Sequence, residues 1–444
     1  MTTGDPADTI VAAATPLARS ALAVVRIDGP RAHAIVCELA GREAPIERMA
    51  TRVTLTYQRE PLDDCVITLY RAPRSFTGND LVELSLHGGP VIVEDVIRAV
   101  LQSGARLAEP GEFTERAVLN GKIDLIQAEA IADLIDARTS LQARMSLANV
   151  AGRLSGEAAG IREKLLFVIS RLEAALDFSE EGYEFITRDA AGAILDEAIR
   201  IEQSLAQSFE RGRATRRGLT IVLLGAPNSG KSTLLNTLVG SERAIVTEIA
   251  GTTRDLISET IEIGGLPVTV TDTAGLRTSI DTVESIGIER ARLAAADADL
   301  VLYLIDSAIG RIAADNDELS RLSITPLMVY TKADLAFAPA GQLAISASSG
   351  LGMSDLFSHL DRTVRDRFAI GADSLAVVNE RQIGALRDGI EALQMAKKTL
   401  ETGASEEMVL VDLYRGGAAV ERLVGRIATD EIYTEIFAKF CIGK

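Results

Sequence analysis

The pattern G-x-x-x-x-G-K-[ST] occurs at Gly225-Ala226-Pro227-Asn228-Ser229-Gly230-Lys231-Ser232. The apolar run Leu219–Leu224 precedes it and the helical pattern Thr233–Val239 follows. Glycines in such a turn let backbone N–H groups converge on phosphate oxygens, and the helix N-terminus adds positive potential. Lys231 can reach the β- and γ-phosphates of a nucleotide, and Ser232 can bind magnesium. With these flanks we predict a phosphate-binding loop rather than a chance glycine-rich turn.

Two further segments supply groups that a nucleotide needs beyond its phosphates. Asp272-Thr273-Ala274-Gly275 ends the next apolar run, where Asp272 can hold the magnesium shell and the Gly275 N–H can contact the γ-phosphate. Thr331-Lys332-Ala333-Asp334 follows the run Pro326–Tyr330. The two oxygens of Asp334 match the paired donors of guanine, which adenine lacks, so this segment predicts GTP rather than ATP.

The order of these segments resembles that of the translation-factor-related GTPases. Lys332 could then lie along the base, and Ser346-Ala347-Ser348 after the last apolar run could offer a backbone N–H to the guanine oxygen. Those proteins usually carry Asn where Thr331 stands, and often Lys or Arg where Ser348 stands. Thr331 keeps a hydroxyl but lacks the amide, so we expect a looser base loop.

The residue that orients the attacking water is not the usual one. Ras-like GTPases place a glutamine directly after D-x-x-G, and here that position is Leu276. Glu284 lies nine residues after Gly275 and could polarise the water, directly or through a second water. An acidic residue favoured by the dipole at a helix N-terminus explains Glu284 about as well.

The segment from Thr247 to Asp255, together with Asn228, resembles the switch region of potassium-activated GTPases. Thr253 fits the switch threonine that binds magnesium. The resemblance implies that potassium is held by Asn228, Thr247, Ile249 and Thr252. A fixed cation there would neutralise developing charge, as an arginine finger does in other GTPases. The alternative for Asn228 is a role in the turn alone.

The complete candidate site combines these segments. We expect Lys231 and Glu284 to be catalytic. The expected GTP-binding residues are Asn228, Ser229, Gly230, Lys231, Ser232, Thr233, Thr247, Glu248, Ile249, Ala250, Gly251, Thr252, Thr253, Asp272, Thr273, Ala274, Gly275, Thr331, Lys332, Asp334, Ser346, Ala347 and Ser348.

The elements that position these residues follow from proline placement and periodicity. Eight of the 12 prolines precede residue 111, and none lies between Pro110 and Pro227 or after Pro339. Apolar residues recur at helical spacing over 123–137, 165–176 and 383–393. Between these stretches, short β-branched runs alternate with helical patterns, which is typical of an α/β domain with a largely parallel sheet. We therefore expect one helical domain interrupted by an inserted α/β domain.

The first 120 or so residues predict a third, α+β domain. Strand runs at Ile10–Ala14, Ala21–Ile27, Val66–Leu69 and Leu81–Leu86 mix there with helices after Pro30 and Pro90. The expected fold is thus multidomain. Its parts are an α+β domain at 1–121, an all-α domain at 122–217 and 376–444, and an inserted α/β P-loop domain at 218–375.

Composition excludes several classes. The 444 residues carry a net charge of −17, which argues against RNA binding through bulk charge and leaves only a local patch or a partner. The three cysteines and three histidines show neither disulfide nor zinc spacing. The start has no basic-then-apolar leader and no apolar run reaches a membrane span of about 20 residues. We expect a cytoplasmic protein that does not associate with membranes.

Motifs outside the P-loop domain resemble one family closely. They are Ala72-Pro73-Arg74-Ser75-Phe76-Thr77-Gly78-Asn79-Asp80, His87-Gly88-Gly89-Pro90, Pro110-Gly111-Glu112-Phe113-Thr114-Glu115-Arg116-Ala117, the segment from Asn120 to Ala130, and the final Phe440-Cys441-Ile442-Gly443-Lys444. Together they look like the MnmE (TrmE) family of bacterial tRNA-modification GTPases, over the whole chain. Such a distributed match is more specific than any single motif.

The resemblance implies a folate-binding, dimerising N-terminal domain. By position, Arg26, Glu83, Lys122 and the terminal Lys444 match the family's folate-site residues, and the cofactor is 5-formyl- or methylene-tetrahydrofolate. A carboxylate can pair with the pterin, and arginine or lysine can hold the glutamate tail. Taken singly, each residue could equally be a solvated surface charge. Cys441 could be a reactive thiol near the folate carbon or simply a packed side chain.

The same resemblance implies the partners and the reaction. A homodimer would work with the flavoprotein MnmG (GidA), which alone carries FAD, in a heterotetramer or larger complex. GTP hydrolysis, with Mg²⁺ and K⁺, would accompany (carboxymethyl)aminomethyl modification of the wobble uridine of tRNA. Arg211, Arg213, Arg216 and Arg217 form a basic cluster that could touch tRNA, although a helix-end role is favoured.

One rival function shares the central motifs. A ribosome-assembly GTPase without modification chemistry usually carries a second GTPase core or an RNA-binding module, and neither is found here. The N-terminal motifs and the Cys-Ile-Gly-Lys tail favour tRNA modification.

Overall fold

The computed structural model describes residues 8–178, 183, 185–241, 243–245, 257–272, 293–368, 379–425, 436–438, 440 and 443. The chain divides into two compact units. The first comprises Met1–Ala132, Asn149–Ile199 and Asp388–Lys444, and the second comprises Asp133–Ala148 and Arg200–Arg387.

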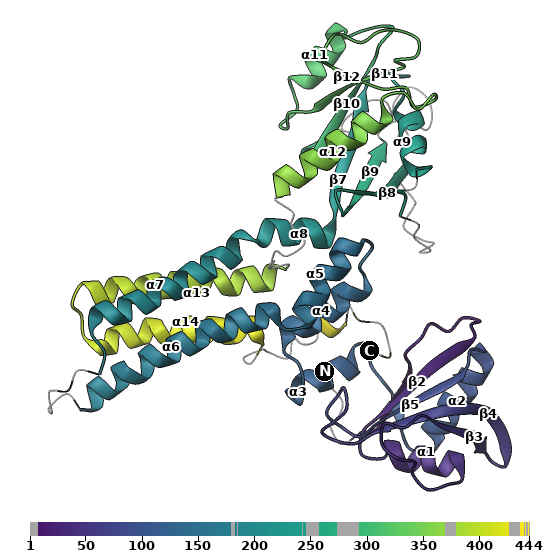
Figure 1. Cartoon of the computed structure of the whole chain (residues 1–444), viewed down its shortest axis with the longest axis vertical. Helices are drawn as coiled ribbons and strands as arrows, with labels where there is room; N and C mark the ends of the chain where they lie inside the picture. The colour runs from purple at the N-terminus through teal and green to yellow at the C-terminus, as the bar shows by residue number, and fades with distance from the viewer. Residues whose placement is uncertain are drawn as a thin grey trace. The chain divides into compact units, whose positions relative to one another are not determined.

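The first unit contains a mostly antiparallel sheet near the N-terminus. Its strands are β1 (Ile10–Ala13), β2 (Leu22–Asp28), β3 (Thr51–Tyr57), β4 (Glu60–Tyr70), β5 (Leu81–His87) and β6 (Arg106–Leu107). They lie in the order β3-β4-β5-β2-β1-β6, with β1 and β6 parallel. Figure 1 labels β2 to β5 of this sheet. The helices α1 (Ala32–Ala40) and α2 (Pro90–Gln102) share one core with the sheet, and residues such as Val25, Ile27 and Leu84 are fully buried there.

Sequence patterns predicted most of this sheet. The runs that begin at Ile10, Ala21 and Leu81 are strands, and helices follow Pro30 and Pro90 as expected. Val66–Leu69 is the end of the longer β4. The strands β3 and β6 were not predicted; β3 alternates polar and apolar residues because one face is exposed, whereas the search relied on apolar runs.

The helical segments on either side of the insertion pack together within the first unit. The helices that lie wholly or mostly in this unit are α3 (Glu112–Leu119), α4 (Leu125–Ile135), α6 (Arg153–Asp177), α7 (Arg188–Gln207), α13 (Glu380–Glu401) and α14 (Glu406–Val424). Most of α5 (Ser140–Val150) and all of α8 (Phe209–Arg217) belong to the second unit. In Figure 1, α6 runs beside α14 and α7 beside α13. Arg162 Nε lies 3.3 Å from Glu421 Oε1, and Arg188 Nη1 donates to the Leu400 carbonyl at 3.0 Å.

One helix is shorter than its periodicity predicts. The pattern over 123–137 indicated a helix through Ala137, but α4 ends at Ile135. Thr139 and Gln142 form a reciprocal cap, because each side chain accepts a hydrogen bond from the other's backbone N–H, at 3.2 and 3.1 Å. This cap begins α5 and therefore separates the two helices.

The second unit contains the α/β domain that the sequence predicted. Its strands are β7 (Leu219–Gly225), β8 (Ile257–Ile263), β9 (Leu266–Asp272), β10 (Leu300–Asp306), β11 (Leu327–Thr331) and β12 (Leu343–Ala344). The order is β12-β11-β10-β7-β9-β8, and the neighbouring strands are parallel except that β8 is antiparallel to β9 (Figure 1). The expected run Leu343–Ser346 is thus a shorter strand. The antiparallel β8 was missed because its sequence alternates polar and apolar residues.

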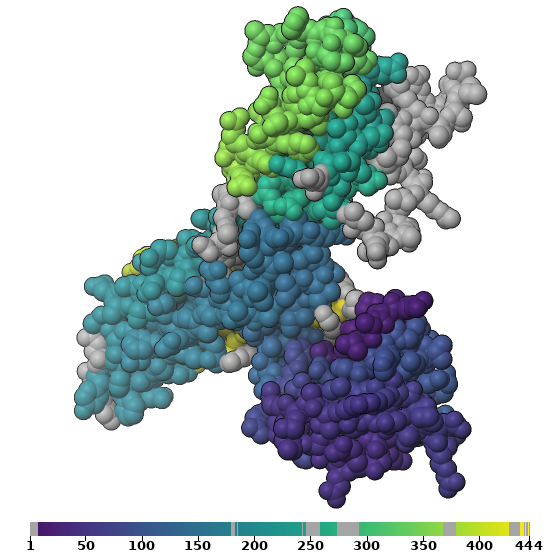
Figure 2. All heavy atoms as spheres, turned by 45° about the vertical axis from the view of Figure 1, so that its right-hand side comes forward, coloured from purple at the N-terminus to yellow at the C-terminus, as the bar shows by residue number. Residues whose placement is uncertain are grey.

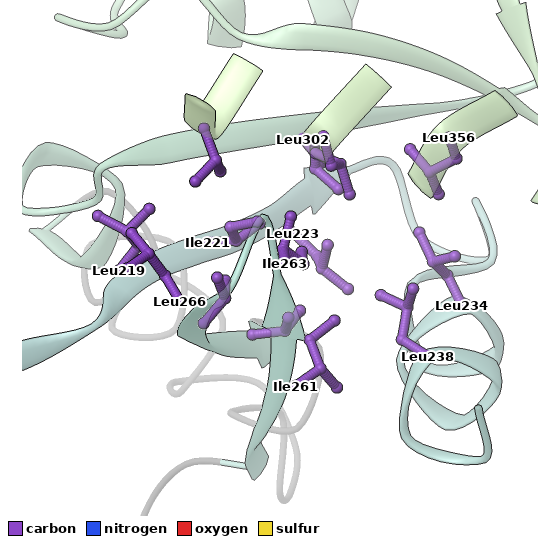
Figure 3. Close-up of a cluster of buried hydrophobic side chains, with 14 of the residues drawn as sticks. Leu219, Ile221, Leu223, Leu234, Leu238, Ile261, Ile263, Leu266, Leu302 and Leu356 are labelled. Carbon is purple, nitrogen blue, oxygen red and sulfur yellow. The ribbon is translucent and has the colours of Figure 1, made fainter. Parts of the chain in front are cut away.

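Helices cover both faces of this sheet, so its central strands are mostly apolar. Figure 3 shows the core on one face, where Leu223 and Leu302 meet Leu234 and Leu238 of α9 (Lys231–Val239) and Leu356 of α12 (Met353–Phe368). On the other face Val301, Tyr303 and Ile305 join a second cluster, and the buried Tyr303 hydroxyl donates to Asp315 Oδ1 of α11 (Ala313–Leu319) at 2.9 Å. Burial on both faces explains the continuous apolar runs. In Figure 2 the green atoms of residues near 350 are closely packed against the teal ones.

Candidate functional site

The loop that the sequence predicts to bind phosphate joins β7 to α9. Gly225 and Gly230 have positive φ angles of 134° and 94°, which a side chain would strain. A Cβ on Gly225 would also overlap the Leu304 carbonyl oxygen of the neighbouring β10. Asn228 adopts a φ of 63°, a left-handed conformation that Asn tolerates better than most residues. This gives Asn228 a role in the turn, whatever else it binds.

The lysine of the loop is fixed by the loop itself. Lys231 is buried, and its Nζ donates to the carbonyl oxygens of Gly225 at 2.9 Å and Ala226 at 2.8 Å. Next to it, the Ser232 hydroxyl donates to Oδ2 of Asp272 at 2.6 Å. Asp272 is buried at the C-terminal end of β9. The structure therefore brings together the hydroxyl and the carboxylate that the sequence assigned to magnesium.

The loop predicted to bind the base is tied to the phosphate-binding loop. The buried Thr331 hydroxyl lies 2.7 Å from the Ser229 carbonyl oxygen, to which it can donate, and 3.2 Å from that of Ile305. The retained hydroxyl thus links the two loops even without the amide of Asn. Asp334, three residues after Thr331, is exposed to solvent.

Lys332 is held by an acidic residue that the sequence analysis did not single out. Its backbone is left-handed at φ 55°, and its Nζ lies 2.7 Å from Oδ2 of Asp306 at the end of β10. Burial favours the neutral form of Asp306, but hydrogen bonds from Lys332 and from the Ala308 N–H lower the pKa of this carboxyl below its ordinary value. The sequence could have indicated Asp306 as a candidate site residue, because it ends an apolar run as Asp272 does.

The last predicted segment forms a tight turn at the same edge of the sheet. The buried Ser346 hydroxyl lies 3.1 Å from that of Ser348 and accepts from the Ser349 N–H at 3.3 Å. The Ala347 carbonyl accepts from the Thr237 hydroxyl of α9 at 3.1 Å. Parallel strands carry all these loops at their C-terminal ends, which is where open α/β sheets bind ligands.

Several expected site residues lie outside the described residues. They are Thr247, Glu248, Ile249, Ala250, Gly251, Thr252, Thr253, Thr273, Ala274, Gly275, Leu276, Glu284, Cys441 and Lys444.

In the N-terminal sheet the structure joins two of the candidate folate residues. Arg26 on β2 faces Glu83 on β5 in the strand register, and its Nε donates to Glu83 Oε1 at 2.9 Å. The Tyr70 hydroxyl donates to the other carboxylate oxygen at 3.3 Å, and burial and the Glu83 charge raise the pKa of Tyr70. No sequence signal pointed to Tyr70, because only the antiparallel register brings it to Glu83.

The other two folate candidates differ. Lys122 is exposed and donates to the Pro73 carbonyl at 2.9 Å, so it lies beside the segment between β4 and β5 rather than on the ion pair. Lys444 is not described, but the preceding Gly443 is buried with φ 99°, and a Cβ there would overlap the Ala13 carbonyl. Gly443 therefore lies against β1, whose Ala12 is paired with Arg26.

Comparisons with known proteins decide the family. The sequence matches the family described as GTP-binding protein TrmE N-terminus over residues 9–122 and the MnmE helical domain family over residues 125–441. A protein of Salinibacter ruber, named tRNA modification GTPase MnmE, is 39% identical over 98% of this chain and 99% of its own. A protein of the same name from Nitrosococcus oceani is 40% identical over 98% and 97%. The chain belongs to the MnmE family of tRNA modification GTPases.

As a member of the MnmE family, the chain is a GTP-hydrolysing enzyme.

Among solved structures, the chain is similar to Aquifex aeolicus Era bound to GDP.AlF4−. The match covers 40% of this chain and 67% of the Era chain, at 23% identity and a TM-score of 0.26. No helix among the described residues is long and apolar enough to cross a membrane.

Two of the four arginines in the basic cluster before the α/β domain form ion pairs within this MnmE-family chain. Arg213 contacts Glu210 at 2.8 Å and Arg216 contacts Asp133 at 2.7 Å, each an ion pair within the second unit. The structural interpretation of these arginines as helix-end residues therefore gains support.

Proposed function

We propose that the chain is the GTP-hydrolysing subunit that modifies the wobble uridine of tRNA with a (carboxymethyl)aminomethyl group. The carbon would come from 5-formyl- or methylene-tetrahydrofolate, with the flavoprotein MnmG as partner. The observation that carries the proposal is the nearly full-length match to relatives named tRNA modification GTPase MnmE. The bonds of Lys231 to the loop carbonyls and the hydrogen bond from Ser232 to Asp272 support its GTPase part.

The donor set at the phosphate-binding loop fits magnesium. The Ser232 hydroxyl and the Asp272 carboxylate are oxygen donors in direct contact, and Mg²⁺ prefers such hard ligands. We assign Ser232 and Thr253 to the metal and Asp272 to the groups around it. Bound magnesium supplies positive charge beside the phosphates. Lys231, held among loop carbonyls by its ammonium group, orients the same phosphates.

Base recognition rests on the exposed carboxylate of Asp334. Lys332 is restrained by Asp306, so its aliphatic stem is placed before the nucleotide arrives. The Ser346–Ser348 turn presents backbone N–H groups at the same edge, and we assign it to the guanine oxygen.

We assign hydrolysis to residues that the sequence analysis predicts to be catalytic or cation-binding. Glu284 would polarise the water in place of glutamine, and Asn228, Thr247, Ile249 and Thr252 would hold potassium. Of these, Asn228 is described, and its exposed position on the left-handed turn leaves its side chain accessible. Bound potassium would place a fixed positive charge beside the phosphates, where negative charge develops during hydrolysis.

The Arg26–Glu83 pair is the proposed centre of the folate site. A guanidinium binds a carboxylate such as a glutamate tail in a forked geometry, and a carboxylate accepts from the amino and ring N–H groups of a pterin. Both side chains are about one quarter exposed, at 25% and 27%, which leaves them reachable. Lys122 and Lys444 would complete the site, with Cys441 close by. We place this site in a homodimer bound to MnmG, which carries the FAD.

Nucleoside analysis of bulk tRNA tests the proposal. A deletion strain should lack the modified wobble uridine, and the parent chain should restore it. The variants Arg26→Ala and Asp334→Asn should fail to restore it, whereas Arg311→Ala, which changes an exposed arginine outside both sites, should succeed. Unchanged tRNA nucleosides together with altered ribosome profiles would instead favour the ribosome-assembly function.

A further inference from the structure

Three arginines from separate segments of the second unit line one pocket. Arg138 precedes α5, Arg243 lies between α9 and β8, and Arg365 belongs to α12. The cavity has a volume of about 460 Å³. The remaining lining residues are Ala244, Ile245, Glu262, Gly264, Gly265 and Asp361.

The turn between β8 and β9 shapes this pocket. Gly264 and Gly265 both have positive φ, at 63° and 89°. The Gly264 N–H donates to Oδ1 of Asp361 on α12 at 2.7 Å, and a Cβ on Gly265 would come within 3.1 Å of Leu141 on α5. The turn is therefore fixed against α12 on one side and α5 on the other.

The charges of the pocket are unevenly matched. The Arg243 Nη1 lies 3.1 and 3.2 Å from the two oxygens of Asp361, and its guanidinium stacks 4.6 Å from the centre of the Phe357 ring. Among the described residues, no acidic group lies within ion-pair distance of Arg138 or Arg365, and both side chains are exposed. Glu262 is the remaining carboxylate. With Asp361 already neutralised, the pocket keeps an excess of positive charge in a chain of net charge −17.

The pocket is separate from the edge of the sheet at which β7, β9, β10, β11 and β12 end, which we call the nucleotide edge because the predicted GTP-binding residues lie there. Strand β9 begins at Leu266, beside the glycine turn, and ends at Asp272, beside Ser232. A strand of seven residues spans roughly 20 Å at about 3.3 Å per residue. Both sites can therefore be occupied at the same time.

We propose that this pocket binds a backbone phosphate of RNA, and specifically of the tRNA substrate. Arginine presents planar forked donors that match phosphate oxygens, and a locally positive pocket attracts RNA to this part of an otherwise acidic chain. The basic cluster at 211–217 is a weaker candidate, because Arg213 and Arg216 are engaged by Glu210 and Asp133. The inference rests on the proposed function, which makes tRNA the substrate.

Fluorescence anisotropy of labelled tRNA with the full chain tests this proposal. The double variant Arg138→Ala/Arg365→Ala should weaken tRNA binding about tenfold at low salt. It should also flatten the dependence of log K on log salt by about one for each lost phosphate contact. The matched control is Arg311→Ala/Arg321→Ala, which removes two exposed arginines of the same unit outside the pocket and should change the affinity less than about twofold. GTP hydrolysis without tRNA should be unchanged in both variants and reports folding.

Each other outcome is decisive. If the two double variants bind tRNA equally, the pocket does not bind RNA. If titrated pyrophosphate binds the parent and not the pocket variant while tRNA binding is unaffected, the site takes free phosphates and the RNA assignment is wrong. If the parent chain binds no tRNA, alone or with its partner, the proposed function fails instead. Should the double variant not fold, Arg365→Gln on the exposed face of α12 carries the same test.

Discussion

The nucleotide edge of the α/β sheet and the Arg26–Glu83 region of the N-terminal sheet are built in different ways. At the nucleotide edge, parallel strands each end in a short polar segment, so Ser232, Asp272 and Thr331 converge although they are far apart in sequence. In the N-terminal sheet, Arg26 and Glu83 meet only because β2 and β5 pair in one antiparallel register. In a parallel sheet the C-terminal ends of all strands lie at the same edge, so residues that follow them are close together. In an antiparallel pair, which two side chains face each other depends on the register of the strands.

The largest expected effect tests base recognition at the nucleotide edge. Asp334→Asn should lower the preference for GTP over xanthosine triphosphate by as much as ~10⁴-fold, because the carboxylate that matches the donor pair of guanine is lost. Nucleotide affinities measured by competition check this, with Asp317→Asn, an exposed acid on α11, as control. Unaltered GTP affinity in the first variant would remove Asp334 from the base site.

The next effect concerns stability in the N-terminal sheet. Arg116 is buried and contacts Asp28 at 2.9 Å and Glu112 at 3.0 Å, both of which are also buried. Arg116→Ala leaves the buried Asp28 without its cation, whereas Glu112 keeps its ion pair with Arg106 at 2.6 Å. Because of Asp28, the free energy of unfolding of the first unit should fall by about 3–5 kcal/mol. Hydrogen exchange at β2 under increasing urea measures it. A loss under 1 kcal/mol would mean that the cluster relaxes by taking up water or protons.

A third prediction separates chemistry from binding at the nucleotide edge. Glu284→Ala should bind GTP as the parent does and hydrolyse it at least ~100-fold more slowly, since a general base acts in the transition state. Glu289→Ala, further along the sequence, should be much milder. Single-turnover kinetics and nucleotide affinity should be measured together. Near-parental turnover, or a loss explained by weak binding, contradicts the role.

The fourth prediction concerns the cation. With Leu276 in place of glutamine, hydrolysis should be at least ~10-fold faster in potassium than in sodium at equal ionic strength, which corresponds to about 1.4 kcal/mol in the barrier. Asn228→Ala should reduce that ratio towards one. Equal rates of the parent in the two salts would leave Asn228 with its turn role only.

The smallest expected effect on stability belongs to Arg26. Its ion pair with Glu83 is about one quarter exposed, so Arg26→Ala should change the unfolding free energy by less than ~1 kcal/mol. Folate affinity should nevertheless fall strongly, and isothermal titration with a tetrahydrofolate measures this. The control is Arg52→Ala, because Arg52 also forms a cross-strand ion pair in the same sheet. This variant should likewise change the stability little, and it should bind folate as the parent does. Equal folate affinity in both variants would make Arg26 structural.

Sequence patterns predicted the elements of the nucleotide edge more fully than those of the N-terminal sheet. Burial on both faces makes β7, β9, β10 and β11 read as largely apolar runs. The last three end in the polar residues Asp272, Asp306 and Thr331, whereas β7 ends in Gly225 at the start of the predicted phosphate-binding loop. The half-exposed β3 and β8 gave no such run and were missed. Asp306 could have been found by the same rule as Asp272, since it also ends an apolar run.

The sequence by itself determined the local features. It specified the phosphate-binding loop through Gly225, Gly230 and Lys231, because backbone conformation and the lysine's reach depend on consecutive residues. The tertiary structure alone decided which distant groups meet: the hydroxyl of Thr331 on the Ser229 carbonyl, the Tyr70 hydroxyl on Glu83, and the three arginines of the pocket. Strand register and helix packing set those contacts, and both are fixed by the buried surfaces of many residues together rather than by any local pattern.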